Sequence, residues 1–364
     1  MELTMWLTRP DAKGVLNDPG VREALPRYVD IVGKRRYAKH LVAKSMPAGF
    51  SRRDETEDLW KLHGSLMDEY KDFEADLDTK GSEPRPVEPS LMGLKTLIAH
   101  RMMQSCGFCE RHCGSDRLHG EKGYCRAGRN FSLFSSFPHM GEEPELVPSG
   151  TIFTGGCTIR CLHCQNWDIS QWGGSGTSVA PELMSLQVRE LAAQGCRNIN
   201  MVGGDPTPVT WHWLETMGNV DLNVATVWNS NSYYSEEAAG LLAGFIDVYL
   251  LDFKYGNDGC AEEISGAPGY WEAATRNHLT AKENGELIIR VLVLPGHNQC
   301  CTRPILQWIH DNLGPMTRVN LMFQYHPEWR ARERADLGRR LRAEEMSEAS
   351  QMAKDIGLRN LVKG

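Results

Sequence analysis

From residue 150 to residue 327, short apolar runs alternate with amphipathic segments, and this alternation restricts the folds open to the chain. The short runs have the composition of strands, and the segments between them have the spacing of helices. Such an order builds parallel strands joined by helical crossovers. We therefore predict an α/β fold, a partial open (βα)6 barrel with its site at the carboxyl ends of the strands. The predicted strands are residues 151–153, 198–202, 223–227, 248–251, 287–293 and 319–323.

The regions around this core differ from it in composition. We predict a helical N-terminal extension and linker over 1–90, a cysteine-rich segment over 91–149, the core over 150–327 and a helical C-terminal tail over 328–364. One helical face of the extension is apolar and predicts a packing surface; it carries Leu59, Leu62, Leu66, Tyr70 and Phe73. The tail predicts a solvated helix rich in arginine, with Arg330, Arg332, Arg334, Arg339, Arg340 and Arg342.

Composition narrows the setting in which the protein works. The net charge is −7, from 40 basic and 47 acidic residues, which gives no general case for binding nucleic acid. No run of about 18 apolar residues occurs, so we expect no membrane span. The first ten residues have no signal-peptide pattern, and eleven cysteines in such a chain suggest thiols that bind metals in a reducing compartment. We expect a cytoplasmic protein.

Three cysteines with the spacing C-x3-C-x2-C follow the first predicted strand: Cys157, Cys161 and Cys164. A chain with this many cysteines has roughly a one per cent chance of such a pattern by accident. Three is an odd number, which argues against disulfides, and a zinc site would need a distant fourth ligand. An iron-sulfur cube fits better, because each thiolate binds one iron and the fourth iron stays open for another ligand.

A second group of cysteines precedes this motif: Cys106, Cys109, Cys113 and Cys125. Four thiols within twenty residues and a C-x2-C beginning are typical of structural zinc. The same set could hold an auxiliary iron-sulfur cluster that relays electrons. His112 and His119 are substitute ligands in either case. The sequence leaves zinc and a second cluster open.

Polar residues follow the predicted strands, at the edge where the site is expected. Gly203 and Gly204 allow a ligand to approach the backbone, and Asp205 beside them could pair with an ammonium group. Arg290 is a charge inside an apolar run and needs a partner, for which a cofactor carboxylate is one candidate. The other polar positions at strand ends are Asn229, Ser230, Asp252, Lys254 and His326.

The loop around Cys157, Cys161 and Cys164 resembles the cluster loop of the radical S-adenosylmethionine superfamily. The order of the later motifs is similar to that of pyruvate formate-lyase activating enzymes over residues 150–327: Gly-Gly-acid-Pro, Asn-Ser, Leu-Asp-x-Lys, Ile-Arg-x-x-Val-x-Pro-Gly and Tyr-His. The chain departs from that family at Asp205, where the family has glutamate, and in its four additional N-terminal cysteines.

This resemblance implies a 4Fe-4S cluster on the three cysteines and S-adenosylmethionine bound by the strand-end residues, Gly203, Gly204, Asp205, Asn229, Ser230, Asp252, Lys254, Arg290 and His326. It implies an enzyme that cleaves S-adenosylmethionine to a 5′-deoxyadenosyl radical and abstracts hydrogen from a substrate. A glycyl-radical enzyme is one expected substrate, and another peptide or a small molecule is the alternative. Reduced flavodoxin or ferredoxin is the implied electron donor. A non-catalytic iron-sulfur or zinc protein is the contrasting hypothesis.

Overall fold

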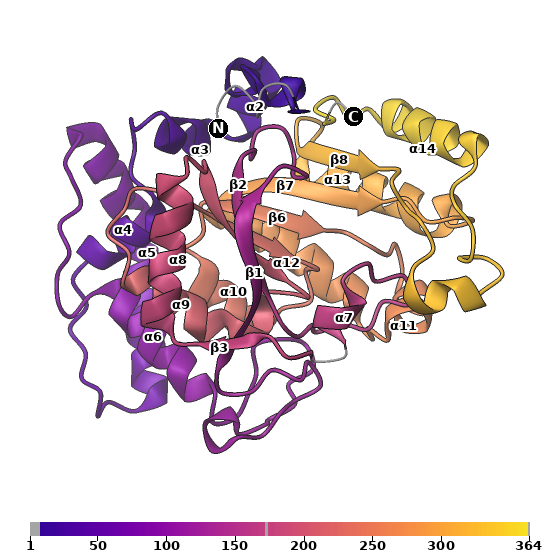
Figure 1. Ribbon diagram of the computed structural model, residues 1–364. Helices are drawn as coiled ribbons and strands as arrows, with labels where there is room; N and C mark the ends of the chain where they lie inside the picture. The colour runs from indigo at the N-terminus through magenta and orange to yellow at the C-terminus, as the bar shows by residue number, and fades with distance from the viewer. Residues whose placement is uncertain (1–7, 172–173, 363–364) are drawn as a thin grey trace.

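One eight-stranded sheet forms the centre of the molecule in the computed structural model, which describes residues 8–171 and 174–362 (Figure 1). The strand order is β3-β1-β2-β4-β5-β6-β7-β8, and every neighbouring pair from β2 to β8 is parallel. The predicted open α/β barrel is confirmed. The six parallel strands are β2 (Ser149–Thr154), β4 (Asn198–Gly203), β5 (Ala225–Ser230), β6 (Val248–Asp252), β7 (Glu286–Leu292) and β8 (Arg318–Met322).

Two further strands extend the sheet beyond β2, and the sequence analysis did not predict them. β1 (Phe131–His139) runs antiparallel to β2, and β3 (Thr177–Val179) runs antiparallel to β1. β1 falls within the segment predicted as cysteine-rich, so the sheet begins before residue 150. Its central residues are half-buried, which explains why it lacks the continuous apolar run that marks a buried parallel strand.

Helices cover the outer face of the barrel. Apolar side chains on that face, such as Trp228 and Tyr249, are buried in the core between sheet and helices. α8 begins at the predicted proline and is followed by Gly195 in the left-handed conformation. The helices are α7 (Trp167–Ser170), α8 (Pro181–Ala193), α9 (Thr210–Gly218), α10 (Glu236–Leu242), α11 (Asp258–Ser265), α12 (Tyr270–Asn284) and α13 (Arg303–Leu313).

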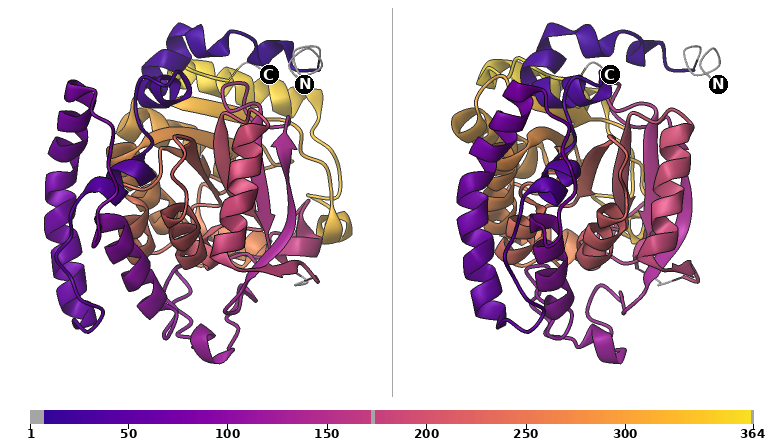
Figure 2. Two further views of the ribbon diagram at one scale, coloured as in Figure 1. Left: turned by 60° about the vertical axis from the view of Figure 1, so that its left-hand side comes forward. Right: turned by 90° about the vertical axis from the view of Figure 1, so that its left-hand side faces the viewer.

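The N-terminal region adds a helical layer to one side of the barrel. α6 (Leu91–Met102) packs on α9, and α5 (Thr56–Lys80) packs on α6 from outside (Figure 2). Ser90 caps α6 as predicted, since its Oγ accepts a hydrogen bond from the Gly93 N–H. The predicted packing face of α5 is confirmed: Leu59 and Tyr70 are buried, and Leu62, Leu66 and Phe73 pack against the same core.

The barrel interior has two layers because side chains alternate along each strand. Val227, Leu250 and Ile288 lie toward the amino ends of their strands and form an apolar cluster with α2 (Pro19–Ala24) and α3 (Pro26–Val32). Two residues further along come Asn229, Asp252 and Arg290, which line a cavity. The N-terminal helices thus close one end of the barrel, and the polar cavity occupies the other.

The C-terminal tail forms an α-helix only after residue 342, and the arginine-rich part before it does not form the predicted helix. Its arginines lie in a 3₁₀ turn, Trp329–Glu333, and in the irregular segment before α14 (Ala343–Ile356). Arg339 pairs with Glu345 at 2.7 Å, and Arg334 pairs with Glu263 at 2.9 Å, so local ion pairs and turns replace helical periodicity. In the N-terminal layer, α4 (Lys39–Ser45) packs against α6.

No helix within the described residues combines the length and the apolar composition that a membrane span requires. Residues 1–7 of the predicted extension and residues 363–364 of the predicted tail lie outside the described residues. The division of the chain into four segments stays a prediction.

Candidate functional site

A cavity of about 510 Å³ opens at the carboxyl ends of the parallel strands, where the site was predicted. It gathers residues that are more than a hundred positions apart in the sequence. Of the predicted site residues, the cavity is lined by Cys157, Cys161, Cys164, Gly203, Gly204, Asn229, Ser230, Asp252, Lys254 and Arg290. Asp205 and His326 are not among its lining residues.

The three-cysteine loop is held in place by backbone hydrogen bonds to α11. The N–H of Arg160 donates to the Ser265 carbonyl at 2.8 Å, and the N–H of Leu162 donates to the Ile264 carbonyl at 2.9 Å. A tight turn follows, in which the Cys164 N–H donates to the Cys161 carbonyl at 3.2 Å. All three thiols therefore face one cavity from a single loop.

Each thiol has a distinct environment. Asn231 Nδ2 donates to Cys157 Sγ at 3.4 Å, and Cys164 Sγ lies 3.2 Å from Ser170 Oγ. Burial raises the pKa of Cys157 well above its usual range. Burial also raises the pKa of Cys161 to about 11, although Lys254 opposes that rise. The thiols of Cys157 and Cys161 therefore hold their protons at neutral pH, so a metal has to displace them.

The donor set fits a site-differentiated iron-sulfur cluster. Among the described residues that line the cavity, the thiols are Cys157, Cys161 and Cys164, which supplies three ligands and leaves one metal corner without protein. A cube binds each thiolate at a different corner, so three thiols on one loop suit it.

The Gly203-Gly204 turn packs against the cysteine loop. The Gly204 N–H donates to the Thr154 carbonyl at 3.1 Å, and the Asp205 N–H donates to the Gly156 carbonyl at 3.0 Å. A Cβ at Gly204 would lie 2.2 Å from the Gly156 carbonyl oxygen. Glycine is needed here because the two backbones touch, and the same residues leave the cavity wall open to a ligand.

Asp205 lies behind this wall, fully buried. Its Oδ1 accepts the Thr207 N–H at 2.9 Å, and its Oδ2 accepts the Ser230 Oγ at 3.0 Å and the Asn231 N–H at 2.8 Å. Burial raises its pKa, while these donors oppose the rise. The carboxylate thus ties the end of β4 to the end of β5, and the structure does not bring it to the cavity.

Arg290 has protein partners, so the expectation of a cofactor carboxylate is not needed to explain its burial. Its Nη2 lies 2.7 Å from Glu143 Oε2, its Nε donates to Glu143 Oε1 at 2.7 Å, and it also pairs with Glu142. Burial alone would lower the pKa of Arg290, but Glu143 and then Glu142 raise it well above its ordinary value. The same pair lowers the pKa of Glu142 to about 2 against the effect of burial.

Asp252 and Lys254 form a partly buried ion pair beside the thiols. Lys254 Nζ lies 2.7 Å from Asp252 Oδ2. Burial opposes the charge on Lys254, but Asp252 and Cys161 raise its pKa above the ordinary value. The cavity therefore presents one cation and one anion next to Cys161. His326 is away from this pair; its Nδ1 lies 3.3 Å from Glu328.

Asn231, which follows Ser230 in the polar run predicted at the end of the third strand, also lines the cavity. No functional signal in the sequence marked four further lining residues: Glu142, Glu143, His163 and Asn320. The burial of Arg290 predicts a nearby carboxylate, but no spacing along the chain identifies Glu142 and Glu143 as its partners. His163 lies between two of the motif cysteines, and its buried Nδ1 has no hydrogen-bond partner. Burial lowers the pKa of His163 to about 3, so the ring is neutral.

The second cysteine group surrounds a buried arginine. Arg117 is 2% exposed and donates from Nη2 to Cys125 Sγ at 3.2 Å and from Nη1 to the Pro208 carbonyl. Burial raises the pKa of Cys106 to about 11, and Arg117 opposes that rise. His119 is exposed and pairs with Asp116. The arginine thus joins the second cysteine group to the loop that follows Gly203.

This cysteine group also touches the first. A Cβ at Gly156 would lie 2.7 Å from the Cys125 carbonyl oxygen, and Arg160 donates from Nη2 to the Tyr124 carbonyl. Gly156 precedes Cys157 directly. The two groups of thiols are therefore built on contacting loops.

Comparison with known proteins agrees with this geometry. Residues 151–309 match the Radical SAM superfamily. MJ0674, an uncharacterized protein of Methanocaldococcus jannaschii, is 39% identical over 340 residues, which cover 92% of this chain and 98% of that protein. MJ0808 of the same organism is 25% identical over 246 residues, 62% of this chain and 71% of its own.

Among solved structures, SuiB of Streptococcus suis bound to S-adenosylmethionine aligns with a TM-score of 0.41 and 12% identity, covering 55% of this chain and 44% of SuiB. The family assignment rests on the sequence matches and on the thiols at the strand ends. Residues 151–309 form a radical SAM superfamily domain, and the chain belongs to the same family as MJ0674.

Proposed function

We propose that this protein is a radical S-adenosylmethionine enzyme in which Cys157, Cys161 and Cys164 bind a 4Fe-4S cluster with one open iron. The observation that carries the proposal is that these thiols line a cavity together with the ends of β4, β5, β6 and β7. When bound, the cluster and S-adenosylmethionine supply the electron and the 5′-deoxyadenosyl radical with which such enzymes abstract hydrogen.

The residues around the thiols suit the cofactor's charges and polar groups. Lys254 offers a cation for its carboxylate, and Asp252 offers an anion for its ammonium group or ribose. Gly203 and Gly204 leave backbone exposed on the cavity wall, and Asn229 and Ser230 add polar groups. Asp205 acts indirectly, because it holds Ser230 and Asn231 in position through hydrogen bonds. Arg290 and its partners Glu142 and Glu143 form the wall of the cavity on the side of β7.

The order of motifs supports a glycine of a partner protein as the first substrate class to test, with another peptide or a small molecule as the alternative. Reduced flavodoxin or ferredoxin is the proposed donor. The group Cys106, Cys109, Cys113 and Cys125 is proposed to hold an auxiliary iron-sulfur cluster. Its loop contacts the loop of Cys157, which suits a cluster that relays electrons to the first.

The test is formation of 5′-deoxyadenosine from S-adenosylmethionine by anaerobically reconstituted protein with dithionite. We expect turnover by the wild type and by Cys196→Ala, which removes a thiol outside both groups. The Cys157→Ala variant should form no product. Equal product from Cys157→Ala and wild type, or none from a wild type that contains iron, contradicts the proposal.

A further inference from the structure

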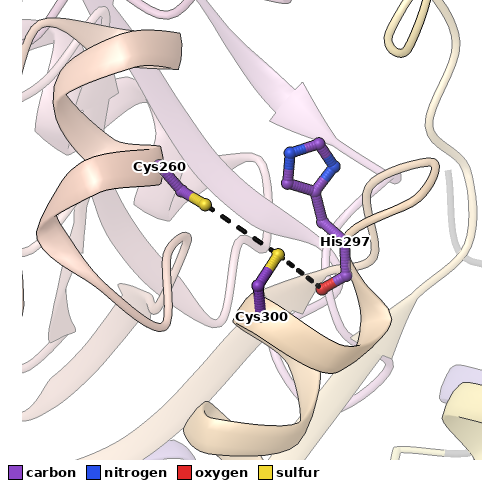
Figure 3. Close-up of side chains that lie close together, drawn as sticks. All are labelled: Cys260, His297 and Cys300. Carbon is purple, nitrogen blue, oxygen red and sulfur yellow. Dashed lines mark hydrogen bonds between the residues drawn. The ribbon is translucent and has the colours of Figure 1, made fainter.

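Another group of metal-ligating side chains lies apart from both cysteine groups. Within residues 8–171 and 174–362, Cys260, His297 and Cys300 are the one set of three or more His, Cys, Asp or Glu side chains whose ligand atoms all lie within 4.8 Å of one another. Cys260 belongs to α11, His297 to the loop after β7, and Cys300 to the π-helical turn Asn298–Thr302. Figure 3 shows the two thiols directed toward each other between these segments.

The separation of the two sulfurs matches that of a tetrahedral ion. Cys260 Sγ lies 3.9 Å from Cys300 Sγ. Two thiolates at zinc-sulfur distances of about 2.3 Å and a tetrahedral angle are about 3.8 Å apart. A disulfide would bring the sulfurs to about 2.05 Å. The pair therefore stands at the distance of shared metal ligands rather than of a covalent bond.

The hydrogen bonds around His297 and the two thiols also suit metal binding. His297 Nδ1 lies 2.7 Å from the Pro295 carbonyl, so that nitrogen carries the proton and Nε2 keeps its lone pair for a metal. Asn257 Nδ2 lies 3.3 Å from Cys260 Sγ and also donates to the Cys300 carbonyl at 2.9 Å, which orients both thiols. The turn that carries Cys300 is π-helical, a geometry that is often found at functional sites.

The set is reachable from solvent, because Cys300 is exposed while Cys260 and His297 are half-buried. Two thiolates and one imidazole form a soft, nitrogen-and-sulfur donor set of the kind that selects Zn²⁺ over Mg²⁺ or Ca²⁺. Three protein ligands leave a fourth position for water.

We propose that Cys260, His297 and Cys300 bind a zinc ion that fastens α11 to the turn after β7. The site matters to the cysteine loop because the carbonyls of Ser265 and Ile264, at the end of α11, hold Arg160 and Leu162 of that loop. Binding releases the two thiol protons and forms two zinc-thiolate bonds and one zinc-imidazole bond, with no change of oxidation state.

The test compares metal binding by the full chain and by matched variants. Protein freed of metals by a chelator under anaerobic, reducing conditions is titrated with Co²⁺, whose thiolate charge-transfer absorption reports on the ligands. The wild type and the control variant Cys196→Ser should each bind one more equivalent of Co²⁺ per chain than the double variant Cys260→Ser/Cys300→Ser. The other cysteine groups are unchanged in all three proteins and contribute equally.

The single variant Cys300→Ser controls for misfolding of the double variant, because the Cys300 side chain is exposed and its replacement should not disturb the core. This variant should also bind one equivalent of Co²⁺ less than the wild type. His297→Gln should keep the charge-transfer absorption of two thiolates but bind more weakly. Zn²⁺ added to the cobalt form should displace that equivalent. Equal cobalt stoichiometry and spectra in wild type and both cysteine variants, or a Cys260–Cys300 disulfide in place of metal in protein purified anaerobically, overturns the proposal.

Discussion

Arg290 on β7 and Glu143, which follows β1, meet inside the barrel with Arg290 Nη2 2.7 Å from Glu143 Oε2. Glu145 of the same loop pairs with Arg318 on β8, with Arg318 Nε 2.8 Å from Glu145 Oε1. β1 lies near one edge of the sheet, and β8 is the other edge. These ion pairs therefore hold the two sides of an open barrel together beneath the cavity.

Arg290→Met should destabilise the protein by about 3–5 kcal/mol, because it leaves two buried carboxylates without their cation. The urea midpoint measures this loss. The triple variant Arg290→Met/Glu142→Gln/Glu143→Gln removes the uncompensated charge and should recover part of the stability. A single variant as stable as the wild type contradicts the role given to the pair.

Cys164→Ala should lower the iron content of reconstituted protein by about four atoms per chain, since two thiolates do not hold a site-differentiated cube. Iron bound by the auxiliary cysteine group should remain. Iron analysis beside Cys113→Ala, which is expected to affect that group instead, separates the two sites. Unchanged iron in both variants would show that neither group binds a cluster.

Asp205→Ala should lower stability by at least about 2 kcal/mol, because three buried donors, on Thr207, Ser230 and Asn231, lose their acceptor. Iron content should stay intact, and S-adenosylmethionine should bind more weakly because Ser230 and Asn231 shift. Asp205→Asn keeps an acceptor and should lie between alanine and wild type. Denaturation midpoints and equilibrium binding measure the two effects. Undiminished stability with weakened binding would instead mean direct contact with the cofactor.

Lys95 gives the stability a dependence on pH. It is fully buried, its Nζ lies 2.7 Å from His63 Nε2, and burial lowers its pKa to about 7. In the unfolded chain a lysine titrates near 10.4, so between these values the unfolded state binds more protons and stability rises with pH. Wild type should gain urea resistance from pH 7 to pH 10 relative to Lys95→Met, which lacks the amine. If the urea midpoints of the wild type and Lys95→Met changed with pH in the same way, Lys95 would not be the source of the pH dependence.

The sequence predicted the parallel part of the sheet well because buried parallel strands are continuous apolar runs. It missed β1 because that strand is half-buried. The three motif cysteines and all the predicted strand-end residues except Asp205 and His326 line one cavity. Spacing along the chain singled out the cysteines, and strand order predicted the edge at which the other residues meet.

The partners of Arg290 were not predictable in the same way, since Glu143 lies 147 positions away and only the folded sheet brings the two together. The site around Cys260 is a similar case. Cys300 is forty residues further on, and neither cysteine belongs to a recognisable spacing pattern. The sequence showed Asp205 as a departure from the family's glutamate, but its burial behind the glycine turn depends on packing that spacing does not reveal.

We infer that the cavity holds a cluster whose open iron binds S-adenosylmethionine. The electron paramagnetic resonance spectrum of anaerobically reconstituted, reduced protein tests it most directly, recorded before and after the cofactor is added. We predict a cluster signal that shifts on addition and is absent from Cys157→Ala. A protein without iron, or a spectrum that does not respond to S-adenosylmethionine, would contradict the claim.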